Sequence, residues 1–239
     1  MNITLLSLFP EVLKKSLEYS LIEKAIEKNI ININYVDIRD YSKNKHKKVD
    51  DYPYSGGPGM LLKPEPLDSA LDINTDKNTK IIYMSPKGEL LNQEKVKSIS
   101  KYEKIAIIAG HYEGIDQRII DNRVDEVISI GDYILTGGEL PALVLIDAVA
   151  RLIPGVLGNE SSHEKESHEN NLLEHPQYTR PYDFKGNKVP DILLSGNHKK
   201  IEKWKRFKSI ELTLKNRSDL IVNKEKILKE YEELKKEFE

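Results

Sequence analysis

The stretch from Ser129 to Leu143, SIGDYILTGGELPAL, has the composition of a ligand-binding loop but none of the cations that hold phosphate. Two adjacent glycines, Gly137 and Gly138, allow a ligand to approach the main chain closely. Such a loop suits an uncharged or cationic ligand held by backbone N–H and C=O groups, and adenine, ribose hydroxyls and a sulfonium all fit this description. Taken alone, the loop is explained more simply as a tight turn from a strand to a helix.

Two earlier loops have a similar character. They are SPKGELL at residues 85–91 and GHYEGID at residues 110–116. Short apolar runs that are typical of buried strands, at residues 80–84, 104–109 and 126–130, precede the three loops. Ligands of open parallel sheets bind at the carboxyl ends of the strands. The three loops therefore predict one composite site.

The elements that must position these loops alternate between strands and helices. Further strands are predicted at residues 3–9 and 30–38, with an amphipathic helix at residues 11–28 between them and another helix opening at Pro141. Residues 50–66, DDYPYSGGPGMLLKPEP, form a turn-rich segment that is too long for a simple connector. The alternation predicts an α/β fold with a mostly parallel sheet.

The sequence changes character after Leu157. Residues 158–171 are polar and without periodicity, which predicts a linker, and the remaining residues show no convincing strand and predict a small helical domain. Trp204 and Phe207 lie in a basic stretch that suits either a phosphate-bearing polymer or a solvated helix face, and we rate the two alternatives as about even. The basic residues of this stretch are Lys199, Lys200, Lys203, Lys205, Arg206, Lys208, Lys215 and Arg217, against the acidic Glu202 and Glu211.

Composition excludes several classes of protein. The 239 residues contain no cysteine, which rules out disulfides, thiolate nucleophiles and Cys-ligated zinc. The N-terminus lacks the basic region of a signal peptide and no apolar run approaches the length of a membrane span, so we expect a cytoplasmic protein. Neither G-x-G-x-x-G nor G-x-x-x-x-G-K-[ST] is present, which disfavours a nicotinamide-dependent enzyme and a nucleoside triphosphate site.

Six segments, in order along the chain, resemble the bacterial tRNA (guanine-N1)-methyltransferases, which belong to the knotted SPOUT methyltransferase class. The segments are YMSPKGELLNQ, AGHYEGIDQR, SIGDYILTGGELPAL, ARLIPGVLG, HPQYTRP and VPDILLSGNH, and the resemblance extends from Met1 to about Leu220. It implies an α/β domain at residues 1–158, with helices on both faces of the sheet and a deep trefoil knot on its C-terminal side. It further implies an interdomain linker at residues 159–171 and an all-helical tRNA-binding domain at residues 172–239.

The resemblance also implies that the three loops bind S-adenosylmethionine in a bent shape, largely through backbone groups. Ile134 and Leu135 have the side chains to cover a purine face. The implied binding residues are Tyr83, Met84, Ser85, Pro86, Gly110, Tyr112, Glu113, Ser129, Ile130, Gly131, Asp132, Tyr133, Ile134, Leu135, Gly137, Gly138 and Pro141.

The implied substrate is the guanosine at position 37 of tRNA, immediately 3′ of the anticodon, and the implied assembly is a homodimer whose active sites are shared between subunits. N1 of guanine carries a hydrogen, so its methylation needs a general base there and a cation near O6. Arg151 matches the essential arginine of the family, although an i,i+4 salt bridge with Asp147 would also explain it. Glu166 stands where the family has a linker aspartate as base.

That replacement leaves the base open among Glu166, Glu164 and Glu169, each of which could also be a solvated linker acid. Smaller departures are Ser55 in SGGPGM, His111 where some relatives carry arginine, and Glu174 in place of aspartate. The six histidines, including His163 and His168 in the linker, form no cluster with metal-ligand spacing. The resemblance allows Mg²⁺ to act through RNA or near Glu113, which the sequence does not show. The alternative function is a catalytically impaired knotted protein that binds RNA.

Overall fold

The computed structural model describes residues 1–54, 56–157 and 166–238. The chain divides into two units, residues 1–160 and 161–239, and each is described by itself. The candidate base Glu164, as well as His163 and Ser55, lies outside the described residues, and so does the side chain of Glu169.

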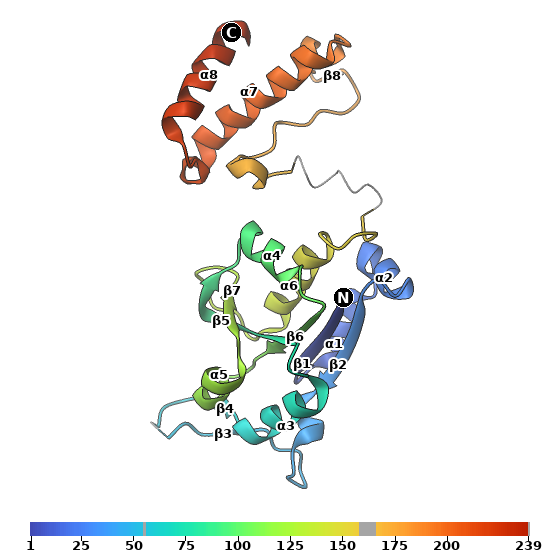
Figure 1. Ribbon diagram of the computed structural model, residues 1–239, viewed down its shortest axis with the longest axis vertical. Coiled ribbons are helices and arrows are strands. Elements are labelled where there is room, and N and C mark those ends of the chain that lie inside the picture. Colours follow the sequence, from blue (N-terminus) through green and yellow to red (C-terminus); the bar gives the residue numbers. More distant parts are fainter. Residues whose placement is uncertain (55, 158–165, 239) are drawn as a thin grey trace. The chain divides into compact units, whose positions relative to one another are not determined.

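A five-stranded parallel sheet forms the centre of the N-terminal unit, with the strand order β2-β1-β6-β5-β7 (Figure 1). The predicted α/β architecture with a mostly parallel sheet is therefore confirmed. The elements of this unit are β1 (Asn2–Ser7), α1 (Pro10–Leu17), α2 (Ser20–Glu27), β2 (Asn32–Asp37), a 3-10 helix (Ile38–Tyr41), β3 (Asp50–Asp51), β4 (Leu61–Leu62), α3 (Pro64–Asn74), β5 (Lys80–Leu90), α4 (Gln93–Ile99), β6 (Lys104–Ala109), α5 (Gln117–Arg123), β7 (Glu126–Ser129) and α6 (Glu139–Ala150).

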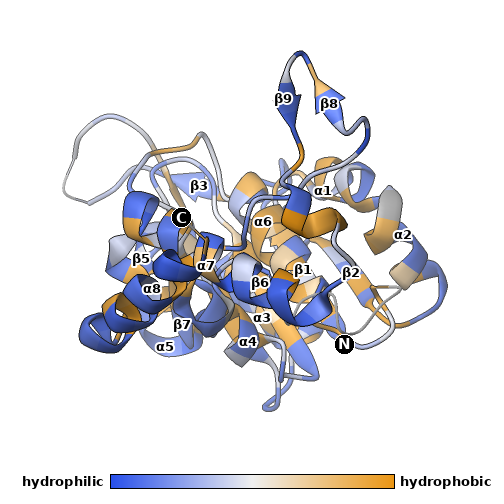
Figure 2. Cartoon of the chain, turned by 90° about the horizontal axis from the view of Figure 1, so that it is seen from above, coloured by the Kyte–Doolittle hydropathy of each residue, from blue (hydrophilic) through white to orange (hydrophobic). Residues whose placement is uncertain are grey.

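Side chains that alternate along the strands build a separate core on each face of the sheet. Strand residues such as Ile105 and Ile107 pack with α1, α2, α4 and α6, whereas Ala106 and Ile108 pack with α3 and α5. This is the period-2 pattern of a sheet that is covered on both faces. Figure 2 shows the apolar residues gathered along the central strands and α6, which is the helix that follows the third loop.

Two elements differ from the sequence prediction. The helix expected at residues 11–28 is broken at Glu18 and Tyr19, where the backbone leaves the helical region. The break allows Leu17 of α1 and Ile22 of α2 to reach the same core. Strand β5 continues to Leu90 instead of ending at Met84, because the chain pairs with β7 again after a shift of register.

The turn-rich segment forms a wall beside the second loop. Its short strands β3 and β4 pair antiparallel. Leu62 then donates its N–H to the carbonyl oxygen of Gly114 at 3.0 Å and accepts from the N–H of Asp116 at 3.2 Å. Leu62 and Ile115 thus form an isolated parallel bridge, which holds the second loop in place.

Two long helices, α7 (His198–Asn216) and α8 (Lys224–Phe238), with 19 and 15 residues, are the main elements of the described part of the C-terminal unit. Phe207 of α7 stacks on Tyr231 and Phe238 of α8 at centroid distances of 5.4 and 6.0 Å. The unit also contains a hairpin of β8 (Asp183–Phe184) and β9 (Asn187–Lys188), so the all-helical expectation missed one small element. In the described part of the chain, no helix combines the length and apolar character that crossing a membrane requires.

Candidate functional site

A cavity of about 490 Å³ lies where β6 and β7 end and where β5 is interrupted after Met84. These strands are neighbours in the sheet, so the three loops that follow them meet, as the sequence predicted. Every residue that the sequence analysis assigned to methyl-donor binding lines this cavity, except Asp132, whose residue is exposed. The assignment of the lining residues to a ligand remains a prediction.

The first loop is a bulge within β5. Met84 and Glu89 both pair with Ile128 of β7, so the four residues between them project from the sheet. Gly88 makes this possible, because an added Cβ there would collide with the backbone of Val127 and Ile128. The bulge carries Ser85 and Pro86 to the cavity.

The second loop packs against the first through the ring of Tyr83. A Cβ added to Gly110 would lie 2.8 Å from Cε2 of Tyr83, and one added to Gly114 would lie 3.2 Å from its hydroxyl. Burial raises the pKa of the Tyr83 phenol, and hydrogen bonds with the Ser85 side chain and the Ile115 backbone partly offset this. The ring is thus a neutral partition between the loops.

The third loop closes on the second through main-chain atoms alone. The N–H of Gly138 donates to the carbonyl oxygen of Gly110 at 2.7 Å. A Cβ on Gly138 would lie 2.7 Å from the nitrogen of Gly110 and 2.8 Å from Cα of Ala109. Since backbone atoms cannot yield as a side chain can, only glycine fits at this position.

Side-chain hydroxyls shape the start of the third loop. The buried Ser129 hydroxyl donates to the carbonyl oxygen of Gly131 at 3.1 Å and accepts from its N–H at 3.2 Å. The Tyr133 hydroxyl donates to the carbonyl oxygen of Ile130 at 3.3 Å. These local bonds hold the loop in a turn, which leaves the exposed side chains of Ile134 and Leu135 on the cavity.

Charged side chains are sparse around the cavity. Among its described lining residues, the ionisable ones other than tyrosine are Lys87, His111 and Glu113. Glu113 packs on Gly59, where an added Cβ would lie 2.7 Å from its Oε1. Lys87 is exposed, so it adds positive charge at a solvent-facing position and forms no buried phosphate site.

His111 adds a polar side-chain contact between the second loop and α6. Its Nδ1 lies 3.8 Å from Oε2 of Glu139, whose other oxygen accepts a hydrogen bond from Ser7 at 2.9 Å. Among the described side chains, Nδ1 of His111 is the buried polar atom that has no hydrogen-bond partner. Phe9 and Tyr112 contact the imidazole edge-on at centroid distances of 5.0 and 5.1 Å.

Several lining residues were missed by the sequence analysis. Gly114 and Ile115 lie inside the quoted motif of the second loop, GHYEGID, and could have been found by assigning every residue of that motif to the site. Leu61 comes from the turn-rich wall and has no recognisable pattern of its own. The lining residues that were not predicted are Leu61, Lys87, His111, Gly114, Ile115, Gln117, Ile120 and Ile128.

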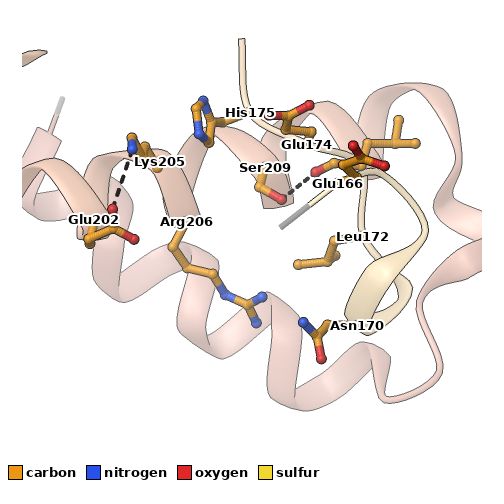
Figure 3. Close-up of a pocket in the computed structure, with 10 residues that line it drawn as sticks. Glu166, Asn170, Leu172, Glu174, His175, Glu202, Lys205, Arg206 and Ser209 are labelled. Carbon is orange, nitrogen blue, oxygen red and sulfur yellow. Dashed lines mark hydrogen bonds and ion pairs between the residues drawn. The ribbon is translucent and has the colours of Figure 1, made fainter. Parts of the chain in front are cut away.

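The two predicted catalytic residues do not line this cavity in a single chain. Arg151 caps the far end of α6, which is 12 residues long, so a helix rise of 1.5 Å per residue puts it about 18 Å from the third loop. Glu166 belongs to the other unit, where it lines a separate pocket of about 270 Å³. That pocket also contains Glu174, another of the departures from the family pattern (Figure 3).

The structure shows how the aromatic and basic residues of the basic stretch are used within the C-terminal unit. Trp204 and Phe207 are buried, so their rings stabilise the C-terminal unit and do not stack on a nucleic-acid base. Many of the cations are paired: the ion pairs are Lys203–Glu237, Lys205–Glu202, Arg206–Glu230, Lys208–Glu211 and Arg217–Asp219. Within the ranges that the structure covers, no three histidine or acidic side chains gather as a metal site.

The tRNA (Guanine-1)-methyltransferase TrmD family model matches residues 1–223 of this chain. This chain belongs to that family. A tRNA (guanine-N(1)-)-methyltransferase of Clostridioides difficile (strain 630) is 53% identical over 224 residues, which cover 92% of this chain and 97% of the relative. The enzyme of the same name from Staphylococcus carnosus (strain TM300) is 50% identical over 238 residues, or 97% of both chains. A third, from Alkaliphilus oremlandii (strain OhILAs), is 53% identical over 229 residues and 92% of both chains.

Family membership supports the methyltransferase interpretation over the catalytically impaired alternative. It also agrees with the character of the cavity, which has glycines and main-chain groups where a phosphate site would need cations.

Proposed function

We propose that this protein transfers a methyl group from S-adenosylmethionine to N1 of guanosine 37 in tRNA. The observation that carries the proposal is the convergence of three glycine-bearing loops on one cavity at the carboxyl ends of β5, β6 and β7. Family membership supports the proposed reaction, and the cavity supports the proposed binding site of the donor. We also propose that it acts in the cytoplasm.

The cavity suits this donor in size and lining. A volume of about 490 Å³ falls within the usual range for small-molecule and cofactor sites, which is roughly 300–1,000 Å³. Apolar side chains such as Ile134 and Leu135 suit a purine, and main-chain groups suit the ribose and the amino-acid part. When bound, S-adenosylmethionine supplies a methyl group on a sulfonium that departs as a neutral thioether.

The protein's own residues must deal with the proton and charge of the guanine. In our proposal, the carboxylate of Glu166 removes the proton from N1 as the methyl group arrives. Arg151 stabilises the negative charge that moves to O6. In-line positioning of N1 against the methyl group supplies much of the remaining rate enhancement.

A homodimer would bring Arg151 to a donor cavity, and α6 carries the features that such an interface needs. Leu140 and Val144 are 60% and 46% exposed, although large apolar side chains are usually covered. Leu140, Val144, Asp147 and Arg151 recur at i, i+4, i+7 and i+11, so they share one face of the helix. A second copy packed on this face would contact Arg151 and take it to the neighbouring active site.

We further propose that the β5, β6 and β7 loops form the trefoil knot of the SPOUT class. The tight crossings support this, because Gly88 and Gly138 lie against the backbone of other loops with no room for a Cβ. The C-terminal unit would bind the tRNA, and the described end of the expected linker, residues 166–171, belongs to that unit.

The experiment uses the full-length protein, labelled S-adenosylmethionine and a tRNA transcript with guanosine at positions 36 and 37. Mass-spectrometric mapping should find the label as 1-methylguanosine at position 37, and a transcript with adenosine at position 37 should stay unlabelled. Glu166→Ala should bind the donor normally but react much more slowly in a single turnover. Label at another atom or position would refute the proposed reaction, and a wild-type rate for Glu166→Ala would refute the assignment of the base.

A further inference from the structure

We propose that Ser209 and Thr213 of α7 are positioning residues that act on Glu166 through the backbone of Leu173. The inference rests on the proposed role of Glu166 as the base. It concerns the described residues 166–174, which form a turn that packs on α7 within the C-terminal unit.

Both backbone polar groups of Leu173 are bound by hydroxyls of α7. The N–H of Leu173 donates to Oγ1 of Thr213 at 2.9 Å. The hydroxyl of Ser209 donates to the carbonyl oxygen of Leu173 (Figure 3). Because Ser209 and Thr213 are four residues apart, they lie on one face of the helix, and both can form hydrogen bonds with Leu173.

Thr213 is fully buried and uses its hydroxyl in both senses. It donates to the carbonyl oxygen of Ser209 at 2.7 Å, which leaves its lone pairs for the Leu173 N–H. Threonine is a mediocre residue for the interior of a helix, and the apolar core around Phe207 and Ile210 gives no reason for a polar side chain. Its contact with Leu173 supplies that reason.

Two further hydrogen bonds connect the gripped residue to Glu166. The N–H of Glu174, the residue after Leu173, donates to Oγ of Ser167, the residue after Glu166, at 3.0 Å. Inside the turn, the N–H of His168 donates to the carbonyl oxygen of Leu172 at 2.8 Å, and the Leu172 side chain is buried. The backbone beside Glu166 is therefore connected to α7 through Ser167, Glu174 and Leu173.

The turn needs this anchoring because its backbone is unfavourable. His168, Asn170 and Asn171 have φ angles of 74°, 52° and 57°, in the left-handed region that residues other than glycine seldom occupy. Asparagine tolerates this region, whereas histidine does so at a cost. Such conformations persist where surrounding contacts fix them, and the grip on Leu173 provides those contacts.

The test compares Thr213→Val, which loses the hydroxyl but keeps the shape, with Thr213→Ser, which restores it. Ile210→Val is the matched control, because it removes one buried methyl group from the same helix without touching the hydroxyls. Glu166→Ala and Glu166→Ala/Thr213→Val complete the set. Each full-length variant is measured for single-turnover methylation at saturating donor and tRNA, for donor affinity and for melting temperature.

We expect Thr213→Val to slow the single turnover about tenfold, since a misplacement of about 1 Å at the chemistry costs up to 100-fold. Thr213→Ser should recover to within about twofold, and Ile210→Val should react at the wild-type rate despite its lower melting temperature. Donor affinity should stay constant throughout. The double variant should react as slowly as Glu166→Ala alone, because residues that act through one another are not additive.

Each contrary result has a distinct meaning. A wild-type rate for Thr213→Val beside a slow Glu166→Ala would overturn the positioning role and leave the proposed function intact. Equal slowing by Thr213→Val and Ile210→Val, or no recovery in Thr213→Ser, would also overturn it. A wild-type rate for Glu166→Ala would overturn both the base assignment and this inference. If Thr213→Val does not fold, Ser209→Ala takes its place under the same criteria.

Discussion

Two cavities of this protein, one in each unit, are built in opposite ways. The one in the N-terminal unit is defined by glycines and main-chain contacts between three loops, with apolar side chains on its walls. The one in the C-terminal unit is lined mainly by charged and polar side chains on α7 and the turn beside it, such as Glu166, Arg206 and Ser209. The shape of the first cavity depends on glycines at the points where loops touch, and that of the second depends on the identity of its side chains.

This difference determines which substitutions each region tolerates. Where loops touch through backbone atoms, even one added methyl group would collide with the neighbouring backbone, so a substitution there should disrupt the whole cavity. Where paired side chains define the pocket, one substitution removes one interaction that solvent partly replaces. We therefore expect steep losses in the N-terminal cavity and graded losses in the C-terminal unit.

The largest loss of donor affinity should come from Gly138→Val. Overpacking costs about 1–3 kcal/mol even where neighbours can move, and here the neighbours are the backbone of Ala109 and Gly110. We expect a loss of at least about 2 kcal/mol in donor binding, or roughly 30-fold, by calorimetry. Gly186→Asn is the control, because Gly186 faces open space and asparagine tolerates its φ of 85°. Equal donor affinities for the two variants would refute the backbone-built cavity.

A loss of stability that is confined to the C-terminal unit should come from Trp204→Ala. Trp204 is 5% exposed and lies 6.4 Å from the ring of Tyr178. Its truncation should destabilise the C-terminal unit by about 3–5 kcal/mol and weaken tRNA binding. Donor affinity should stay within about twofold of the wild type, since the residues that line the proposed donor site belong to the N-terminal unit. The control Trp204→Phe should lose much less stability, and a parallel loss of donor binding would show that the units are not independent.

The smallest effect concerns the Arg206–Glu230 ion pair between α7 and α8. Hydrogen bonds from Arg206 hold the pKa of Glu230 below its ordinary value of 4.5. A depressed carboxyl pKa stabilises the fold above the unfolded value, and that stability is lost as the pH falls below about 4.5. The pair is about one third exposed, so Glu230→Gln should cost only about 0.5 kcal/mol at pH 7 and almost nothing at pH 3.

Urea unfolding at the two pH values checks this, with Glu232→Gln as a control on the same helix. A cost for Glu230→Gln that does not change with pH would contradict the ion-pair explanation.

The sequence predicted well which loops line the cavity of the N-terminal unit, because the backbone conformations that require glycine can be recognised in a sequence. Gly137 and Gly138 stand next to each other at the end of an apolar run, and β6 fell at residues 104–109 as expected. Strand β5 was predicted too short, because its second stretch depends on pairing with β7 after a register shift that no local pattern records. Likewise, Tyr19 interrupts a helix whose periodicity continues across the break, since the core and not the local sequence decides the bend.

The C-terminal site was less predictable, because it depends on tertiary contacts that no local sequence pattern records. The sequence left open whether the basic stretch around Trp204 and Phe207 binds a phosphate-bearing polymer or forms a solvated helix face, and it did not show that a small unit needs both rings for its own core. The hydrogen bonds of Ser209 and Thr213 with Leu173 join residues that are 36 and 40 positions apart. A hydroxyl residue in a predicted helix gives no indication of such a distant backbone partner. Contacts of this kind become visible only in three dimensions.

A crystal structure of the full-length protein with S-adenosylhomocysteine, the demethylated form of the donor, tests the central proposal most directly. We predict electron density for the compound between Tyr83–Pro86, Gly110–Ile115 and Ser129–Gly138, with its polar groups contacting main-chain N–H and C=O groups. Density at any other place, or a compound held mainly by Lys87 and other cationic side chains, would contradict the site described here.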